Sequence, residues 1–539
     1  MSRSRGLPSV LSQKVGDKFA AEGVEIKETH EERSERTRSA GVSTAEVDAE
    51  MGVLSERTRR VAQPAPSPAR AFSSSFWLGT LTSLFLAVSM GCSAASGAVA
   101  VQSPAPSPAW TPEPSATALP DEPVIHPDGA AEYRALWVDG FHQGFKSPKQ
   151  IDTLIARAHT GNLNALFVQV RKRGDAYFLR GVEPLASDID YPNHPNWDPL
   201  AYLIQKAHTA NPPLQVHAWM NTFFVGQTSE VFQDNGDQWG NLRVSGSNDG
   251  YGYLDPGIPA VRAYTQDVMT QVVRHYNVDG IHLDFVRYPD GGDWGYTKIS
   301  LDLFSKATGR SDRPDPSDPA WQQWRRDQVT AFVQGLHDAI QKIRPTVKLS
   351  GALIAYGNGP SSDAEFQATR TYNDVYQDWA TWFRKGYLDL GVPMNYDRDS
   401  SPSQQKFFRA WTAWEKDLGK GHLLVGVGAF LNYPEDTMTQ IRAALAPTAA
   451  GNRPLGVAIY SYASTSVYAT DDFYLAPNDQ GYLPRQPYTP STDPKYLFDR
   501  AVQFNEWFYT ALSAPSNYQD PALGKVVTTP IFLKPAPIP

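Results

Sequence analysis

Short apolar runs alternate with helix-like segments along residues 131–512, and this alternation constrains the fold more than any other feature. Eight runs have the length and the Val, Ile, Leu and aromatic content of buried strands. They are 133–141, 164–171, 214–223, 278–289, 347–356, 388–396, 423–431 and 455–464. Strands that alternate with helices predict a parallel sheet, and eight such units predict an α/β fold of the (β/α)8 TIM-barrel type.

Two connections are longer than a strand–helix turn requires: 224–256 after the third strand and 290–319 after the fourth. We therefore expect enlarged βα loops at these two places, on the side of the barrel that carries active sites. An open doubly wound sheet is the alternative. It predicts a glycine-rich phosphate loop after the first strand, and "DGFHQGFKSP" has no GxGxxG pattern.

Helix start signals support the same division of the chain. Ser147 and Asp198 each stand before a proline, which is typical of a capping residue followed by the first helical position. Ser403 precedes a further amphipathic run, and the helical pattern at 320–344 stops at the next proline.

Outside 131–512 the chain divides into four further parts. Residues 1–70 are polar and charged, so we expect them to be disordered, or untranslated if the start codon lies downstream. Residues 71–92 resemble a signal sequence. Residues 93–130, rich in Pro, Ser and Ala, predict an extended linker. Residues 513–539 predict an irregular tail.

The apolar run "FWLGTLTSLFLAVSMGC" ends at Cys92 and follows several arginines. It is short for a membrane-spanning helix and suits a secretory signal. Its end resembles a bacterial lipoprotein signal, although Ser89 stands where Leu is usual. We expect Cys92 to carry a lipid that anchors an exported protein to a membrane of the cell envelope. An uncleaved anchor helix and plain secretion are the alternatives.

Composition excludes several classes of protein. One cysteine rules out an intrachain disulfide and a thiolate metal cluster. A net charge of −8 without a basic face argues against nucleic acid as a partner. Aromatic residues reach 12%, which suits a cleft for sugars. We expect a monomer that needs no cofactor and no metal.

The fourth strand, "VDGIHLDFVRYP", carries ionisable residues in a run that should be buried. Alternation places Ile281, Leu283 and Phe285 toward the helices, and His282 and Asp284 toward the barrel interior. Asp284 falls near the end of the strand, where the interior opens. His282 is then placed to hydrogen-bond Asp284 or a sugar hydroxyl.

Other strands place polar and aromatic residues together on one face by the same alternation: Trp137 and Asp139, Gln169 and Arg171, and His217, Trp219 and Asn221. The sixth strand ends in Asn395, Tyr396 and Asp397, and the eighth offers Tyr460 and Tyr462. Because the carboxyl ends of barrel strands open on one side, we expect them to form one pocket.

Carboxylates, amides and aromatic rings suit glycoside hydrolysis, in which one carboxyl protonates the leaving oxygen and another attacks the sugar or activates water. We expect Asp284 to take the second role; a salt bridge to Arg287 or Arg171 is its structural alternative. Several acids remain open for the first role: Asp139, Asp378, Asp397 and Glu365.

Other functions compete with hydrolysis at carboxylates. A metal hydrolase would use His217, His282, Asp284 and Asp139, but the chain has no HExxH motif and no HxH on the first strand. A glycan-binding envelope lipoprotein would keep the cleft without turnover. A scaffold without a ligand would have the cleft filled by the two insertions.

Six motifs occur in a specific order: "RALWVDGF", "LNALFVQVRKRGDAYF", "VHAWMNTF", "VDGIHLDFVRYP", "WRRDQV" and "VYQDWATWFRKGYLDLGVPMNY". Together they resemble the glycosyl-hydrolase-like family 10 domain of bacterial cell-envelope proteins over 131–464. The resemblance implies a TIM barrel, often on a lipoprotein, and action by some members on peptidoglycan glycan strands. It marks these cleft residues: Gln169, Arg171, Asp175, His217, Trp219, Asn221, Asp284, Tyr288, Arg325, Tyr376 and Tyr396.

The fourth strand is also distantly similar to that of the alpha-amylase clan, whose aspartate is the nucleophile. His282 stands where that clan has arginine, and Phe285 where many relatives have a second aspartate, so no second acid follows Asp284 directly. We therefore expect a glycoside hydrolase that cleaves a cell-wall (peptidoglycan-type) or other extracellular polysaccharide. The expected catalytic residues are Asp284, Asp139 and Asp397, and the expected substrate contacts are Gln169, Arg171, His217, Trp219, Asn221, His282, Tyr288, Tyr396 and Tyr460.

Overall fold

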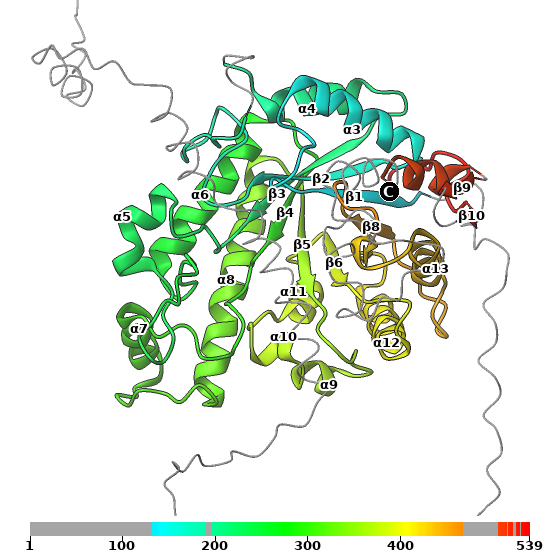
Figure 1. The fold of residues 1–539 in the computed structure, drawn as a ribbon. Coiled ribbons are helices and arrows are strands. Elements are labelled where there is room, and N and C mark those ends of the chain that lie inside the picture. Colours follow the sequence, from blue (N-terminus) through cyan, green and yellow to red (C-terminus); the bar gives the residue numbers. More distant parts are fainter. Residues whose placement is uncertain (1–130, 190–195, 467–504, 515, 521–523, 529) are drawn as a thin grey trace, which may run out of the picture. The chain divides into compact units, whose positions relative to one another are not determined.

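Parallel strands pair in chain order and close on themselves, β8 returning to β1, to form a barrel (Figure 1). The computed structural model describes residues 131–189, 196–466, 505–514, 516–520, 524–528 and 530–539. The strands are β1 (Tyr133–Val138), β2 (Ala165–Arg171), β3 (Gln215–Asn221), β4 (Gly280–Asp284), β5 (Lys348–Ile354), β6 (Leu390–Asn395), β7 (Leu424–Gly428) and β8 (Gly456–Tyr460). The predicted (β/α)8 barrel is confirmed.

Helices separate the strands along the chain and lie outside the barrel (Figure 1). They are α3 (Pro148–Thr160), α4 (Pro199–Thr209), α5 (Glu230–Trp239), α6 (Pro259–His275), α7 (Lys298–Thr308), α8 (Pro319–Ile343), α9 (Asp363–Gln367), α10 (Arg370–Asn373), α11 (Trp379–Lys385), α12 (Pro402–Gly419) and α13 (Pro434–Leu445). A short 3₁₀ turn, η1 (Ala429–Leu431), follows β7, and residues 505–513 are helical.

Two of the predicted capping residues act as expected. The side chain of Ser147 accepts a hydrogen bond from the third residue of α3, and that of Asp198 from the corresponding residue of α4. The third expectation was wrong, because α12 begins after Ser401. Ser403 lies inside the helix and does not cap it.

Side chains divide between two apolar layers according to strand alternation. Leu136 and Val138 of β1, for example, pack with the helices in the larger outer core. The inner layer fills the barrel with Tyr133, Ala135, Trp137, Ala165, Phe167, Trp219, Leu390, Val392, Leu424 and Ala458. The barrel interior is therefore a packed core, and a cavity can open only above it.

The fourth strand is shorter than the sequence predicted. It ends at Asp284, and Phe285 adopts a left-handed backbone conformation with φ of 49°. The Phe285 backbone does not continue the strand, and its ring contacts Phe224 and Tyr253 of the loop after β3. Asp284 thus stands at the end of β4.

Long connections leave the barrel where the strands end, which we call the mouth. The insertions predicted after β3 and β4 are present and contain α5 and α7. Residues 172–198 after β2 form a further long connection, which sequence analysis did not single out. These loops surround the mouth and supply many of the residues described below.

The C-terminal tail is more ordered than expected. β9 (Ser516–Asp520) and β10 (Gly524–Thr528) pair in an antiparallel hairpin. The last residues then reach the opposite end of the barrel, where the strands begin. Pro537 O accepts a hydrogen bond from Glu132 N at 3.0 Å, and Phe532 O accepts one from Asn162 Nδ2 at 2.6 Å.

Several predicted segments lie outside the described residues: the extension 1–70, the signal 71–92 with Cys92, and the linker 93–130. Among the residues that the structure describes, no helix combines the length and the apolar character needed to cross a membrane.

Candidate active site

Asp284 is held at the end of β4 by three hydrogen-bond donors. Its Oδ1 accepts from the Phe285 N–H at 2.6 Å and from the Arg287 guanidinium at 3.4 Å. Its Oδ2 accepts from the Trp219 indole N–H at 3.2 Å. None of these groups can accept a proton, so all three contacts favour the ionised carboxylate.

Burial opposes the charge on this group. Burial raises the pKa of Asp284 above its ordinary value, while the charge of Arg287, the Phe285 N–H and the hydrogen bonds of Arg287 and Trp219 counteract that rise. The side chain lies mostly below the surface, with the residue 6% exposed. Asp284 is therefore a partly desolvated carboxylate, the state that suits a nucleophile or a general base.

Aromatic rings from three strands surround Asp284. The Tyr396 and Tyr460 ring centroids lie 5.4 Å apart, and Trp219 lies 6.3 Å from Tyr460. Burial raises the pKa of Tyr396 well above its ordinary value, and the charges of Tyr460 and Asp284 add to that rise. The structure thus brings together four of the residues predicted to share a pocket.

His282 forms the floor beneath this group and does not contact Asp284. Its Nε2 lies 2.9 Å from the Trp137 indole nitrogen, and its Nδ1 lies 2.9 Å from Ser350 Oγ. Because an indole can only donate, Nε2 is the acceptor and the proton is on Nδ1. The ring also stacks on Phe167 at 4.4 Å.

The two roles considered for His282, contact with Asp284 or with a sugar, are therefore not supported by its geometry. Both ring nitrogens have protein partners, and the residue is fully buried. Burial, with a further contribution from His217, lowers the pKa of His282 well below its ordinary value, so the ring is neutral.

His217 lies one layer deeper. Its Nε2 contacts Gln215 Oε1 at 3.1 Å, its Nδ1 has no hydrogen-bond partner, and burial lowers its pKa to about 4. A side chain at Gly280 would collide with it. His217, His282, Asp284 and Asp139 do not gather: within the described part of the chain, no three His, Cys, Asp or Glu residues are close enough to hold a metal ion.

Gln169 and Asn221 connect the loops at the mouth. Gln169 accepts from Gly140 N at 2.9 Å and donates to Asn221 Oδ1 at 3.0 Å. Asn221 in turn donates to Lys172 O at 2.7 Å. Both amides are buried, so they position the loops after β1 and β2, and a substrate contact by either would have to displace these bonds.

Arg171 and Tyr288 have structural partners away from Asp284. Arg171 is fully buried and makes two hydrogen bonds of 2.6 Å to Glu183. Tyr288 is fully buried, contacts Asp255 Oδ1 at 3.4 Å and packs edge-on against Tyr376. Their positions do not support the predicted substrate contacts, because neither side chain reaches the surface.

Asp139 follows β1 and fixes the next turn. Its Oδ1 accepts from the N–H groups of Phe141 and His142 and lies 2.8 Å from His142 Nδ1, while its Oδ2 is buried without a partner. Burial alone would raise the pKa of Asp139, but the contacts with His142 and the Phe141 N–H outweigh it and lower the pKa. Asp139 is therefore an ionised carboxylate.

Asp397 differs from Asp139 in its protonation. It follows β6, one residue after Tyr396, and burial raises its pKa to about 8 against the opposing charge of Arg398. Among the described residues no side-chain hydrogen bond engages its carboxyl, and no direct contact joins it to Asp284. When Asp397 is ionised, its charge raises the pKa of Glu415 in α12. Asp397 is a mostly protonated acid at neutral pH.

The other two acids considered from sequence have local roles. Asp378 caps α11 by accepting from Thr381 N at 3.2 Å. Glu365 is exposed and accepts from Ser361 N at 2.7 Å.

The ion pair between Asp284 and Arg287, considered from sequence as the structural alternative for Asp284, is present, whereas Arg171 pairs with Glu183 instead.

Sequence analysis missed the polar residues that lie beyond Arg287. Asp290 accepts from Tyr356 OH at 3.4 Å and from Arg370 at 3.3 Å. Burial alone would lower the pKa of Arg287, but Tyr253, Tyr356, Asp284 and Asp290 together raise it. The available signal was the segment "RYPDGG", in which an arginine and a second aspartate follow β4 directly.

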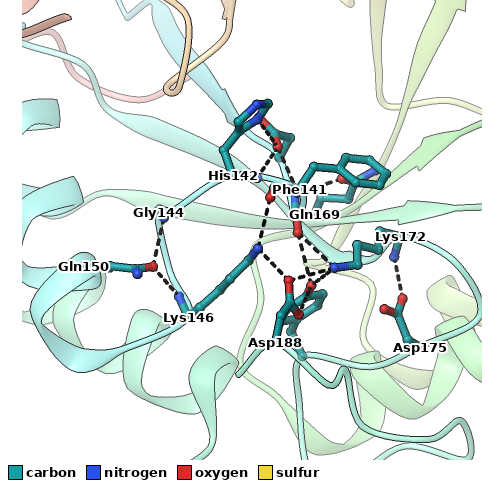
Figure 2. Close-up of polar contacts among 12 residues, drawn as sticks. Phe141, His142, Gly144, Lys146, Gln150, Gln169, Lys172, Asp175 and Asp188 are labelled. Carbon is teal, nitrogen blue, oxygen red and sulfur yellow. Dashed lines mark hydrogen bonds and ion pairs between the residues drawn. The ribbon is translucent and has the colours of Figure 1, made fainter. Parts of the chain in front are cut away.

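A second missed cluster lies where the loops after β1 and β2 meet (Figure 2). Lys146 and Lys172 both contact Asp188 Oδ2, at 2.7 and 2.9 Å. Tyr177 OH donates to Asp188 Oδ1 at 2.6 Å. The signal was the dense run of charges in "RKRGD" after the second strand.

A TIM barrel with a partly desolvated carboxylate among aromatic rings at its mouth is an architecture compatible with glycoside hydrolysis. Residues 132–430, more than half of the chain, match the family described as glycosyl hydrolase-like 10, and the protein belongs to that family. The family expected from the sequence motifs is confirmed.

Two curated relatives are similar to part of the chain. The chain is 26% identical over 285 residues to Glycosyl hydrolase YngK of Bacillus subtilis (strain 168), covering 50% of this chain and 53% of that protein. It is 26% identical over 263 residues to Glycosyl hydrolase DigH of Escherichia coli (strain K12), covering 43% and 54%. The chain thus spans about half the length of these relatives.

Among solved structures, the glycoside hydrolase domain of PgaB (BpsB) from Bordetella bronchiseptica is similar with a TM-score of 0.46 and 15% identity. The alignment covers 65% of this chain and 96% of that domain.

Proposed function

We propose that the protein is a glycoside hydrolase that cleaves a cell-wall polysaccharide of the peptidoglycan type, or another extracellular polysaccharide, through Asp284. The proposal rests mainly on the hydrogen bonds to this carboxylate: two side chains and a backbone N–H orient it at the end of β4. Tyr396 and Tyr460 beside it supply flat surfaces on which a sugar ring can lie.

In this proposal Asp284 attacks the sugar or activates water, and Asp397 protonates the leaving oxygen. The pKa of about 8 at Asp397 keeps its proton at neutral pH, as a general acid requires. Asp139 is a weaker candidate for the acid, because the contacts with His142 and the Phe141 N–H lower its pKa and hold it as a carboxylate. Membership of a glycosyl hydrolase-like family supports the reaction type.

The test compares Asp284→Asn with the unchanged protein on peptidoglycan and a panel of polysaccharides, with new reducing ends detected by mass spectrometry. Asp302→Asn, a change at an exposed acid on α7, is the matched control. We expect Asp284→Asn to lose at least about a hundredfold in rate while keeping its fold, and the control to keep full activity.

Equal turnover by Asp284→Asn and the unchanged protein would contradict the proposed mechanism. Polysaccharide binding without turnover in either form would support the alternative, a glycan-binding protein that keeps the cleft.

We also propose that the protein is a monomer that acts at the cell envelope, either anchored to a membrane by a lipid on Cys92 or secreted. The apolar run that ends at Cys92 and the Pro-rich residues 93–130 support this placement, because together they would hold a domain away from a membrane surface. Labelling with a radioactive fatty acid should mark the full-length protein, and Cys92→Ser should abolish the label.

A further inference from the structure

Arg173 lies at the barrel mouth, two residues after the end of β2. Its guanidinium lies over the Phe141 ring, 5.2 Å from the centroid. Its aliphatic part lies beside Gly226 of the loop after β3: a Cβ added there would stand 3.4 Å from the Cβ and Cδ of Arg173. The Arg173 side chain therefore lies against the loops after β1 and β3.

The Arg173 guanidinium has no protein partner in the part of the chain that the structure describes. Its Nε is buried without a hydrogen bond, and no carboxylate pairs with it. The neighbouring lysines differ, since Lys146 and Lys172 both bind Asp188 (Figure 2). Asp175 accepts the backbone N–H of Arg173, not its side chain.

An unpaired, half-buried guanidinium is unusual, because buried polar groups are normally hydrogen-bonded and each missing bond costs stability. Arg173 also differs from a purely solvated charge, since its Nε is buried and its guanidinium lies over the Phe141 ring. These observations indicate a ligand that completes its hydrogen bonds.

The position of Arg173 connects it with Asp284. Asn221 Nδ2 donates to the carbonyl of Lys172, the residue before Arg173, at 2.7 Å. Asn221 is also the β3 partner of Asp284 in the parallel register between β3 and β4. The segment that carries Arg173 is thus attached to the strand next to Asp284, on the same side of the barrel.

We propose that Arg173 binds a carboxylate carried by the polymer, so that the cleft takes an acidic polysaccharide. This inference rests on the proposed function and narrows its substrate class. A guanidinium presents two parallel N–H groups that match the two oxygens of a carboxylate, and it stays charged at any physiological pH.

The experiment measures binding to two soluble polymers that share a backbone: carboxymethyl chitin, which is anionic, and glycol chitin, which is neutral. Affinity electrophoresis of the full-length protein at low ionic strength gives both dissociation constants. We expect binding to carboxymethyl chitin to be tighter by about tenfold or more, the size of a charge-assisted contact.

Arg173→Gln should remove this preference, and Arg173→Lys, which keeps the charge but loses the fork, should retain only part of it. Arg180→Gln removes an exposed arginine from the same connection and should leave the preference unchanged. Equal affinities of the unchanged protein for the two polymers, no binding to either, or a full preference in Arg173→Gln would each overturn the proposal. Thermal unfolding of each variant separates a loss of fold from a loss of binding.

Binding is therefore measured in an Asp284→Asn background, and turnover is measured separately in the unchanged protein. A preference that depends on Arg173, together with no turnover by the unchanged protein, would leave the inference standing and reject the hydrolase. Turnover by the unchanged protein without a preference for the carboxylated polymer would support the hydrolase and reject the inference about Arg173.

Discussion

The indole nitrogen of Trp219 lies 3.2 Å from Oδ2 of Asp284, and the two residues come from neighbouring strands of the barrel. This contact links the aromatic wall of the mouth with its central carboxylate. It also makes the ionisation of Asp284 depend on a side chain that has no charge of its own.

Replacing Trp219 by Phe should keep a ring in place and remove the donor. Loss of a hydrogen bond to a carboxylate raises the pKa of Asp284, so the acidic limb of the pH profile of kcat/KM should move upward by about one pH unit. Trp382→Phe, which removes a buried indole bound to Thr330, is the control and should leave the limb in place. An unmoved limb in Trp219→Phe would show that Asp284 is not the group that titrates.

The raised pKa of Asp397 predicts an alkaline limit. As the pH rises through about 8 the acid loses its proton, so kcat/KM for a polysaccharide should fall. Asp397→Asn should lose about a hundredfold on the polysaccharide but much less on an aryl glycoside, whose leaving group needs no protonation. An equal loss on both substrates would argue against Asp397 as the acid.

Glu415 and Asn395 form a buried pair that predicts a stabilising substitution. Asn395 Nδ2 donates to Glu415 Oε2 at 2.8 Å, while Glu415 Oε1 and Asn395 Oδ1 are buried acceptors without partners. A proton on Glu415 would satisfy both acceptors. Burial and the charge of Asp397 raise the pKa of Glu415 to about 8, against opposing contributions from Asn395 and Lys416.

A carboxyl whose pKa is raised on folding stabilises the protein below its unfolded value, about 4.3, and this contribution is lost as the pH rises toward 8. Glu415→Gln supplies a permanent N–H donor in place of the proton. At pH 8 its free energy of unfolding should therefore exceed that of the unchanged protein by about 1–3 kcal/mol, with little difference at pH 4. Glu230→Gln, an exposed change on α5, should show no such pH dependence. A destabilised Glu415→Gln at pH 8 would contradict the shared proton.

His217 predicts a pH dependence of the opposite sign. Burial lowers its pKa to about 4 in the folded protein, so its contribution to stability is present above the unfolded value of about 6.5 and is lost as the pH falls toward 4. The loss amounts to about 3 kcal/mol. His217→Gln should flatten the curve of unfolding free energy against pH in this window. The exposed His275→Gln should leave the slope unchanged, and a His217→Gln slope like that of the unchanged protein would refute the assignment.

The C-terminal segment should contribute to stability through Phe532. This ring is 1% exposed, lies under the Arg134 guanidinium at 4.4 Å, and its carbonyl accepts from Asn162. Phe532→Ala should cost about 3–5 kcal/mol in urea unfolding. Leu533→Ala, at an adjacent residue that is 48% exposed, should change stability by about 0.5 kcal/mol or less. Equal effects of both changes on the free energy of unfolding would mean that burial of Phe532 does not stabilise the barrel.

Strand alternation allowed much of this architecture to be predicted. It assigned the inward positions of β4 and the position of Asp284 at the end of the strand, because hydrophobic period and strand length are local properties. Alternation does not predict, however, how deep in the barrel an inward-facing side chain lies. His282 and Asp284 share a face, yet one is sealed beneath Trp137 and the other opens to the mouth.

Loop residues escaped prediction for a different reason. Tyr288 and Asp290 are two residues apart, but Tyr288 is buried against Asp255 whereas Asp290 lies beside Arg370 near Asp284. Their positions depend on packing between the insertions after β3, β4 and β5, which no periodicity records. In the sequence, Arg173 is likewise one residue of a charged run. Only the structure shows that its guanidinium lacks a hydrogen-bond partner among the described residues.

The hydrogen bond from Trp137 to His282 spans the barrel between its first and fourth strands and closes the space below Asp284. Asp284 consequently stands above a closed floor. In the proposed reaction, saccharide and water would both have to approach Asp284 from the mouth. The loops that border the mouth would then influence how fast a cleaved fragment leaves and how fast the next turnover begins.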